Sequence, residues 1–449
     1  MIQEKNFFQH LISNIDWWLI FAIALLMIIS FGAIYSAGVN YGTSIRYLSV
    51  QCLASGIGLV GLLLLTSINY QYYKYLSKFV YILSLALLIS VLIFGSVKRG
   101  TKGWFDFGFI SFQPVEIAKI MFILTLSAVL DLKATEVKKW YFLLSAFTIL
   151  TGHLILIMMQ PDFSSTLSYF PVTLVLLFII GVNPFYLGCI VILGGFAVGI
   201  PLAKTFLNIQ MKFLESEIVP INILNFLQTG SGEFYIIAAI LTLIIGIWWF
   251  FWKLRIKIPI VYTVVLCVAI IIGCLASISV EKSLKDYQRK RLVAFLNPNV
   301  DPRGSGYNII QSQIAIGSGK FTGKGFKKGT QTQLGFLPEQ HTDFIFSVVG
   351  EEGGWILSQL TLLLYFMFIW RALVIAKESR DRYGSLVATG LATMFTFYVV
   401  INVGMAMGMM PVTGMPLLIL SYGGSSIFSS LCAIGILCSI RMRRHTHVK

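Results

Sequence analysis

Residues 17–37 read WWLIFAIALLMIISFGAIYSA, an apolar run without a charged side chain. A helix needs about 20 such residues to cross a hydrocarbon core of roughly 30 Å, so this run is long enough to span a membrane. Similar runs recur along the 449 residues. They predict an all-α polytopic membrane protein with twelve spans, near 17–37, 47–67, 76–95, 115–131, 140–158, 164–181, 185–204, 233–252, 258–280, 344–370, 384–410 and 415–440.

The composition agrees with this fold class. Hydrophobic residues make up 57% of the chain and charged residues 12%, against roughly 25% charged in ordinary soluble domains. A soluble or disordered protein is therefore excluded. The six cysteines lie scattered in apolar stretches without CxxC spacing, so they are interpreted as core or lipid-facing thiols rather than metal or redox ligands.

The distribution of basic residues predicts the orientation. The net charge is +15, and Lys and Arg concentrate in short cytoplasmic loops of membrane proteins. The predicted spans place the basic loops 133–139, 253–257 and 371–382 on the side of both termini, whereas the opposite loops 159–163 and 411–414 have no Lys or Arg. We expect both termini to be cytoplasmic. The charge then fits a lipid bilayer, and no nucleic acid partner is needed to explain it.

Two segments on the opposite side are basic as well. The short loop 96–114 has three basic residues against the rule, which indicates a function. Residues 281–343 have ten Lys or Arg and five Asp or Glu and little spanning character, so they are predicted to form a large extracytoplasmic loop suited to a negative partner. Within it, 284–296 is predicted to be a helix on the membrane surface and 308–316 a short helix.

Polar residues gather at the predicted outer end of the fourth span. Trp104, Gln113, Glu116 and Lys119 lie there, and the last two are three residues apart, so they can form an ion pair on one helical face. Ionisable groups inside a span are costly and indicate function by default. An ion pair that only packs helices together is the alternative.

The fifth and sixth spans are joined on the same side by Gln160, Asp162, Ser164 and Ser165. A helix cap formed by one of the two serines is a sufficient structural explanation for them. The large loop, with Asp301 and the run LPEQHTD at 337–343, is expected on that side too, as is SYGGSS at 421–426. We therefore predict a shared cleft that opens outward.

Other chemistries have no support in the sequence. GSGK at 317–320 is followed by Phe321 rather than Ser or Thr, so it is not a phosphate-binding loop for nucleotides. The five histidines show no metal spacing, and no GxSxG motif is present.

Several ordered motifs resemble those of the shape, elongation, division and sporulation (SEDS) family. They are GWFD (103–106), FQPVEIAK (112–119), QPDF (160–163), NPNVDPRGSGY (297–307), QS (311–312), AIGSG (315–319), GTQTQL (329–334), FLPE (336–339), HTDF (341–344) and SYGGS (421–425). They extend over most of the chain, and GTQTQL is more similar to the RodA-like elongation branch than to the division branch.

The resemblance implies a glycosyltransferase of the bacterial cytoplasmic membrane. Such an enzyme polymerises lipid II into peptidoglycan on the extracytoplasmic side, together with a class B penicillin-binding protein and other membrane proteins of the elongation complex. It also implies that Asp301 is the catalytic carboxylate. Family members have about ten spans, so 205–257 is predicted to be an insertion within a single membrane-embedded domain 1–449, beginning with an outer loop at 205–232.

The chemistry of the residues fits this role. Extending a glycan requires a base for the attacking hydroxyl and a positive environment for the departing pyrophosphate. Asp301 precedes a proline and glycines that let its loop approach a substrate, although a turn-forming Asp-Pro is the structural alternative. The candidate substrate-binding residues are Trp104, Gln113, Glu116, Lys119, Asp162, Lys324, Gln331, Glu339, His341 and Asp343.

Alternatives stay open at the level of the sequence. The basic residues can equally meet anionic lipid headgroups, and Glu339, His341 and Asp343 can simply hold the loop geometry. A lipid II flippase is the second functional hypothesis, and a non-catalytic scaffold for a partner polymerase is the third. No cofactor is identified, and a divalent cation at the pyrophosphate is left open.

The predicted orientation can be tested by cysteine labelling. Single cysteines placed at 301 and 341 are expected to react with a membrane-impermeant maleimide from outside the cell. Labelling of both positions from the cytoplasmic side alone would contradict the extracytoplasmic cleft.

Overall fold

The computed structural model describes residues 15–39, 42–98, 100–106, 108, 111–137, 139–213, 259–283 and 305–444, with scattered residues between 238 and 298. The chain divides into two compact units. Unit 1 comprises 1–181 and 308–449, and unit 2 comprises 182–307.

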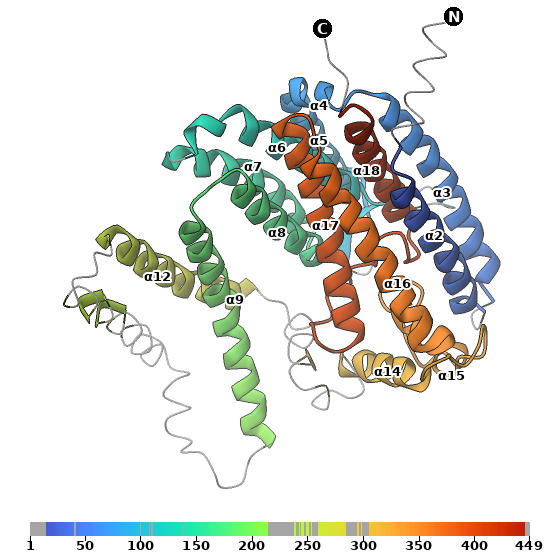
Figure 1. The fold of residues 1–449 in the computed structure, drawn as a ribbon. Coiled ribbons are helices and arrows are strands. Elements are labelled where there is room, and N and C mark those ends of the chain that lie inside the picture. Colours follow the sequence, from blue (N-terminus) through green and yellow to red (C-terminus); the bar gives the residue numbers. More distant parts are fainter. Residues whose placement is uncertain are drawn as a thin grey trace, which may run out of the picture. The chain divides into compact units, whose positions relative to one another are not determined.

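Unit 1 is a bundle of helices with one small sheet (Figure 1). Its elements in chain order are α2 (Trp17–Ala37), α3 (Ser44–Ser67), α4 (Gln71–Tyr75), α5 (Ser77–Phe94), β1 (Ser96–Lys98), β2 (Thr101–Asp106), β3 (Ser111–Phe112), α6 (Pro114–Leu132), η1 (Ala134–Glu136), α7 (Trp140–Met159), α8 (Phe163–Ile179), most of α14 (Ser305–Ser318), α15 (Thr330–Gln333), α16 (Ile345–Lys377), α17 (Arg382–Ala406) and α18 (Gly424–Met442).

The helices agree with the predicted polytopic fold. Among the described residues, nine helices are long and apolar enough to cross a membrane by length and composition. Two further predicted spans are α8, a shorter apolar helix, and α6, whose sequence carries Glu116, Lys119 and Asp131. Eleven of the twelve predicted spans therefore correspond to helices, and the twelfth, 233–252, falls mostly outside the described residues.

Close helix pairs depend on small residues. α18 packs along α3, and a Cβ added to Gly435 would lie 2.7 Å from the carbonyl oxygen of Leu62. A Cβ on Gly58 would come within 2.6 Å of Leu431 Cδ1 on the facing helix. Glycines let these backbones approach, which is how membrane helices gain packing contacts without a hydrophobic driving force between them.

Two predicted boundaries near the C-terminus are wrong. The last span was expected from 415, but its helix starts at Gly424. The residues just before it are hydrogen-bonded elsewhere: Ser421 donates to the carbonyl of Thr342, and Tyr422 N to that of His341. The span expected at 344–370 is longer, since α16 runs to Lys377. α16 is also broken at Gly354, which has φ 65° and ψ −160°.

The basic loop 96–114 forms a three-stranded antiparallel sheet in the order β1-β2-β3. Lys98 Nζ lies 2.8 Å from Asp106 Oδ2 across the first hairpin. The hydrogen bond from Lys98 holds the pKa of the Asp106 carboxyl below its usual value. One of the three unexpected basic residues therefore has a local partner in the sheet.

Unit 2 contains α9 (Pro184–Phe213) and α12 (Ile260–Ser283), which pack against each other. A Cβ on Gly273 of α12 would lie 2.8 Å from the carbonyl oxygen of Leu193, so the two helices are in close contact. The outer loop predicted to begin at 205 starts later, because α9 continues to Phe213. The remainder of 205–257 lies largely outside the described residues, and the predicted surface helix 284–296 does so as well.

Near the start of α2, ion pairs connect the ends of several helices of unit 1. Asp16 is 4% exposed, caps α2 by accepting a hydrogen bond from Leu19 N at 3.2 Å, and receives Arg371 Nη2 at 2.5 Å. Arg441 Nε lies 3.8 Å from the same carboxylate, and Arg441 also pairs with Glu378. One buried carboxylate thus joins the ends of α2, α16 and α18.

Replacing Asp16 by Asn is expected to destabilise unit 1. Asn still caps a helix but has no charge, so the change removes the charge-assisted bonds from Arg371. We expect a loss of about 1.5–3 kcal/mol in the free energy of unfolding, seen as a lower unfolding temperature in detergent. Asp106→Asn, at an exposed ion pair, is the matched control and should leave that temperature unchanged.

Candidate functional site

The start of α6 carries the first part of the candidate site. Pro114 occupies the first turn, where its missing N–H costs nothing, and Gln113 is the N-cap residue. Glu116 and Lys119 follow on one face, and Lys119 Nζ lies 2.7 Å from Glu116 Oε1. The predicted ion pair is confirmed.

This ion pair is enclosed by the bundle. Glu116 is 5% exposed and Lys119 is 3% exposed. Lys119 also donates a hydrogen bond to the hydroxyl of Tyr398 on α17, and its ammonium lies 4.5 Å from the centre of that ring. A buried charge is tolerated only when paired and hydrogen-bonded, and both conditions are met here.

Asp162 connects α8 to α6. Its carboxylate caps α8 by accepting hydrogen bonds from Ser165 N at 3.0 Å and from the hydroxyls of Ser164 and Ser165. The serine cap considered from the sequence is not formed, because Asp162 is the N-cap residue of α8. Gln113 Nε2 donates to Asp162 Oδ2 at 3.1 Å, which completes what we call the α6 cluster: Gln113, Glu116, Lys119, Asp162 and Tyr398.

The segment before α18 links the α6 cluster to a distant part of the sequence. Gln113 N donates to Ser425 Oγ at 2.7 Å. Three residues before Ser425, Tyr422 N donates to the carbonyl of His341 at 2.9 Å, and the preceding residue Ser421 donates its hydroxyl to the carbonyl of Thr342 at 2.6 Å. Hydrogen bonds therefore link the 113, 162, 341 and 421 regions within unit 1, whereas the shared cleft that opens outward stays a prediction.

His341 lies among aromatic rings. Its ring stacks on Tyr47 with centres 4.6 Å apart and lies 5.6 Å from the ring of Tyr422. Burial raises the pKa of the Tyr422 hydroxyl above its ordinary value. These three residues, with Glu339 and Asp343 on either side of His341, form the His341 cluster.

Glu339 and Asp343 shape the turn around His341. Glu339 has φ 52°, and its carbonyl accepts hydrogen bonds from Thr342 N and Asp343 N. The carbonyl of Asp343 accepts Asn402 Nδ2 at 2.8 Å. These backbone contacts fit the structural role that the sequence left open for both residues, while a contact of either with substrate stays a prediction.

Lys324 and Gln331 meet at α16. Lys324 Nζ lies 2.8 Å from Glu351 Oε1, and Gln331 N donates to the same oxygen at 2.9 Å. Glu351 is 0% exposed and also accepts Thr332 N at 2.9 Å. We call this group, with Thr330, the Glu351 cluster. Gln340 Nε2, which donates to the carbonyl of Thr332 at 3.1 Å, connects it to the His341 cluster.

Two predicted residues are placed differently or not at all. Trp104 lies in β2, where its carbonyl accepts Ser96 Oγ at 3.0 Å, and among the described residues its side chain makes no hydrogen bond to any of the three clusters. Asp301 lies outside the described residues. Its role as the catalytic carboxylate stays a prediction.

Glu351 and Tyr398 were not among the site residues predicted from the sequence. Glu351 lies inside an apolar run, and an ionisable group in a span indicates function by default, so this rule would have found it. Tyr398 had no such signal, because a tyrosine in an apolar helix is ordinary. Only the packing of α17 on α6 reveals it.

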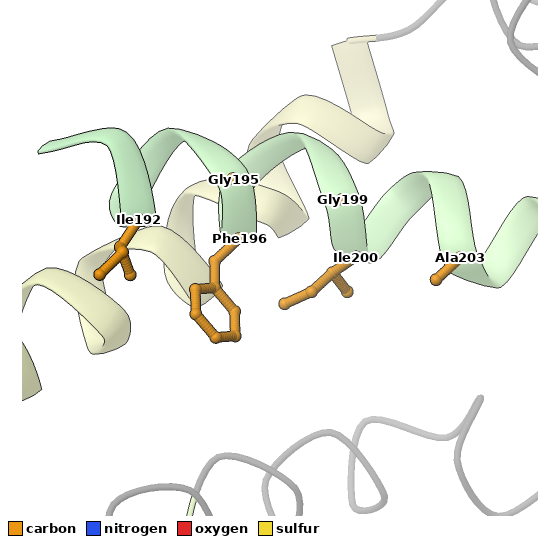
Figure 2. A pocket seen from close by; sticks show the side chains of 6 residues that line it. All are labelled: Ile192, Gly195, Phe196, Gly199, Ile200 and Ala203. Atoms are coloured by element: carbon orange, nitrogen blue, oxygen red, sulfur yellow. The ribbon is translucent and has the colours of Figure 1, made fainter. Parts of the chain in front are cut away.

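An apolar hollow of about 360 Å³ lies along α9 in unit 2. Its lining residues are those labelled in Figure 2: Ile192, Gly195, Phe196, Gly199, Ile200 and Ala203. Within the described part of the chain, no group of three or more His, Cys, Asp or Glu could hold a metal ion.

The Glu116–Lys119 pair should behave as a unit. Glu116→Gln or Lys119→Met alone leaves one charge buried without its counter-ion, so we expect each to cost about 3–5 kcal/mol of unfolding free energy. The double variant removes both charges and should recover most of that loss, as measured by unfolding temperature in detergent. Additive losses in the double variant would contradict the pairing.

The comparisons with known proteins agree with the resemblance noted in the sequence. The model of the cell cycle protein family that groups FtsW, RodA and SpoVE matches residues 11–213 and 212–446. The peptidoglycan glycosyltransferase RodA of Treponema pallidum is 36% identical over 444 residues, covering 96% of this chain and 99% of its own. The peptidoglycan glycosyltransferase MrdB of Escherichia coli is 30% identical, covering 99% of this chain and 97% of its own.

Solved structures have the same fold. A chain from a peptidoglycan synthase complex, studied for the coordination of polymerization and crosslinking, is similar with a TM-score of 0.67 and 25% identity, covering 96% of this chain and 99% of that one. The rod shape determining protein RodA of Thermus thermophilus is similar with a TM-score of 0.59 and 23% identity, covering 96% and 98%. By family model, by identity over nearly its whole length and by fold, the chain belongs to the FtsW/RodA/SpoVE family of membrane proteins.

Proposed function

We propose that this chain is a peptidoglycan glycosyltransferase that polymerises lipid II into glycan strands during cell elongation. The family and the names of its relatives support this activity. The single observation that carries the proposal in the structure is the α6 cluster. A paired Glu116 and Lys119 lie buried beside Gln113 and Asp162, at the bundle end where the loops converge.

The reaction requires few groups. The acceptor hydroxyl of one lipid-linked glycan attacks the anomeric carbon of the other, a new C–O bond forms, and the bond from that carbon to the pyrophosphate oxygen breaks. Asp301 takes the proton of the attacking hydroxyl as general base, and undecaprenyl pyrophosphate leaves with the bonding electron pair. General base catalysis of this kind contributes typically about 10²–10⁴-fold to a rate.

The remaining residues bind and orient the substrate. Gln113 and Asp162 offer amide and carboxylate groups that can hydrogen-bond sugar hydroxyls, and the Glu116–Lys119 pair holds the α6 face beneath them. Lys324 binds the pyrophosphate of the lipid-linked donor through its ammonium group. Trp104, Gln331, Glu339, His341 and Asp343 complete the predicted substrate-binding set.

The family also supports a proposal for the location and the partners of the enzyme. We propose a multi-pass protein of the bacterial cytoplasmic membrane with cytoplasmic termini and an extracytoplasmic active site. A class B penicillin-binding protein is the proposed partner, consistent with a structural relative that belongs to a peptidoglycan synthase complex, and other membrane proteins of the elongation complex are further proposed partners. A divalent cation at the pyrophosphate stays a prediction, because the structure does not describe the part of the proposed active site that contains Asp301.

The assay that tests the proposal is polymer formation from purified lipid II by the full-length chain alone, in nanodiscs. Glycan strands separated on a gel are the expected product. No polymer from the chain alone, but polymer after addition of a partner polymerase, would favour the scaffold. Transfer of lipid II between leaflets without polymer would favour the flippase.

Asp301→Asn is expected to abolish polymer formation while the protein still inserts and folds, because the amide cannot accept the hydroxyl proton. Asp106→Asn, at the exposed hairpin pair, is the control and should retain the activity of the unchanged chain. Equal polymer yield from the Asp301 variant and the control would remove Asp301 from the mechanism.

A further inference from the structure

The break in α16 receives a loop from another part of unit 1. At Gly354 the helix turns, and a Cβ there would lie 2.2 Å from Gly323 N, so only glycine fits. Lys324 N donates to the carbonyl of Glu351 and Gly325 N to that of Glu352, both at 3.0 Å. The loop 319–325 therefore satisfies carbonyls that the broken helix leaves without intrahelical partners.

The second half of α16 is tied to the same loop. Trp355 N donates to the carbonyl of Lys320 at 2.9 Å, and Ile356 N donates to that of Phe321 at 3.2 Å. The rings of Phe321 and Trp355 also stack with centres 5.3 Å apart. The loop is thus held on both sides of the break, which fixes the backbone from which Lys324 projects.

Glu351 holds the side chains of this segment. Its two carboxylate oxygens accept hydrogen bonds from six donors: Lys324 Nζ at 2.8 Å, Thr330 Oγ1 at 3.2 Å, Gln331 N at 2.9 Å, Thr332 N at 2.9 Å, Thr332 Oγ1 at 2.7 Å and Ser318 Oγ at 3.4 Å. A Cβ on Gly329 would lie 2.7 Å from Glu351 Oε2, so the chain passes close to this carboxylate. The acid therefore organises residues 318–332 as a unit.

The two members of the ion pair differ in exposure. The side chain of Glu351 is 0% exposed and that of Lys324 is 26% exposed. An ammonium has three N–H donors, and Lys324 uses two of them on Glu351 and on Thr330 Oγ1 at 2.6 Å. The third donor can reach an acceptor outside the protein. Residues 318–333 contain four lysines and no acidic residue, so the acceptor that fits is an anion.

We infer that Glu351 is a positioning residue for the transferase: it holds Lys324 and the 318–332 segment in the place where the lysine binds the pyrophosphate of the lipid-linked donor. This inference rests on the proposed function. Glu351 itself stays buried and does not touch the substrate. Its effect on the reaction passes through the orientation of Lys324.

The test measures KM and kcat for lipid II with the full-length chain in nanodiscs. Lys324→Met is expected to raise KM about tenfold or more, the factor for a lost charge-assisted hydrogen bond. We expect little change in kcat, because Lys324 binds the pyrophosphate equally in the substrate and in the transition state. Glu351→Gln should raise KM similarly. Lys324→Arg, which keeps the charge and the reach, should retain a KM near that of the unchanged chain.

Glu352→Gln is the matched control. Glu352 is the neighbouring buried acid on the same helix, but it accepts hydrogen bonds from Ser36 and Gln333 rather than from Lys324. We expect this variant to lower the unfolding temperature and to leave KM unchanged. A rise in KM equal to that of Glu351→Gln would overturn the inference, because it would reflect general loosening of α16.

The double variant Glu351→Gln with Lys324→Met decides between positioning and independent effects. If Glu351 acts through Lys324, the KM of the double variant should equal that of Lys324→Met alone. A KM raised by the product of the two single-variant factors would overturn the inference. If Glu351→Gln does not fold, Thr332→Val removes one donor to the carboxylate from the loop side and should give a smaller rise in KM; an unchanged KM overturns the inference. If the unchanged chain makes polymer and Glu351→Gln has a normal KM, this inference is wrong but the proposed function stands. If the unchanged chain makes no polymer, the proposed function is wrong as well.

Discussion

The structure depends on one constraint: a charge inside an apolar helix bundle must have a partner. Glu116 meets Lys119, Asp16 meets Arg371, and Glu351 meets Lys324, and each of the three carboxylates is almost completely buried. Leaving any of them uncompensated would cost several kcal/mol. The Asp16–Arg371 and Glu351–Lys324 pairs join different elements, and Lys119 of the Glu116 pair also contacts Tyr398 of α17. The requirement that buried charges be paired therefore constrains how the helices and loops of unit 1 are arranged.

Polar backbone groups inside the bundle must also have hydrogen-bond partners. In a bilayer, broken helices persist only where other protein segments satisfy the freed N–H and C=O groups. The break at Gly354 meets this condition through the 319–325 loop, and the stretch before α18 meets it through His341 and Thr342. Irregular backbone thus collects at the bundle end that also holds Gln113 and Asp162, which is where a membrane enzyme can expose polar groups to a substrate headgroup.

Such an arrangement suits the chemistry of the family. Lipid-linked sugars present a headgroup at the membrane surface while their anchors stay in the hydrocarbon region. A rigid bundle with polar loops docked into one end can bind that headgroup without opening its core. The α6, His341 and Glu351 clusters are connected through backbone and side-chain hydrogen bonds. A substitution in one cluster is therefore expected to alter the geometry of the next.

The sequence by itself determined the fold class, the spans and the family, because long apolar runs and ordered motifs are local properties of the chain. It also gave the Glu116–Lys119 pair, since residues three apart share a helical face. Only the tertiary structure decided that Tyr398 closes this pair and that Lys324 is held by Glu351. The partners concerned are up to 279 residues apart, and such contacts are set by helix packing, which no local pattern encodes.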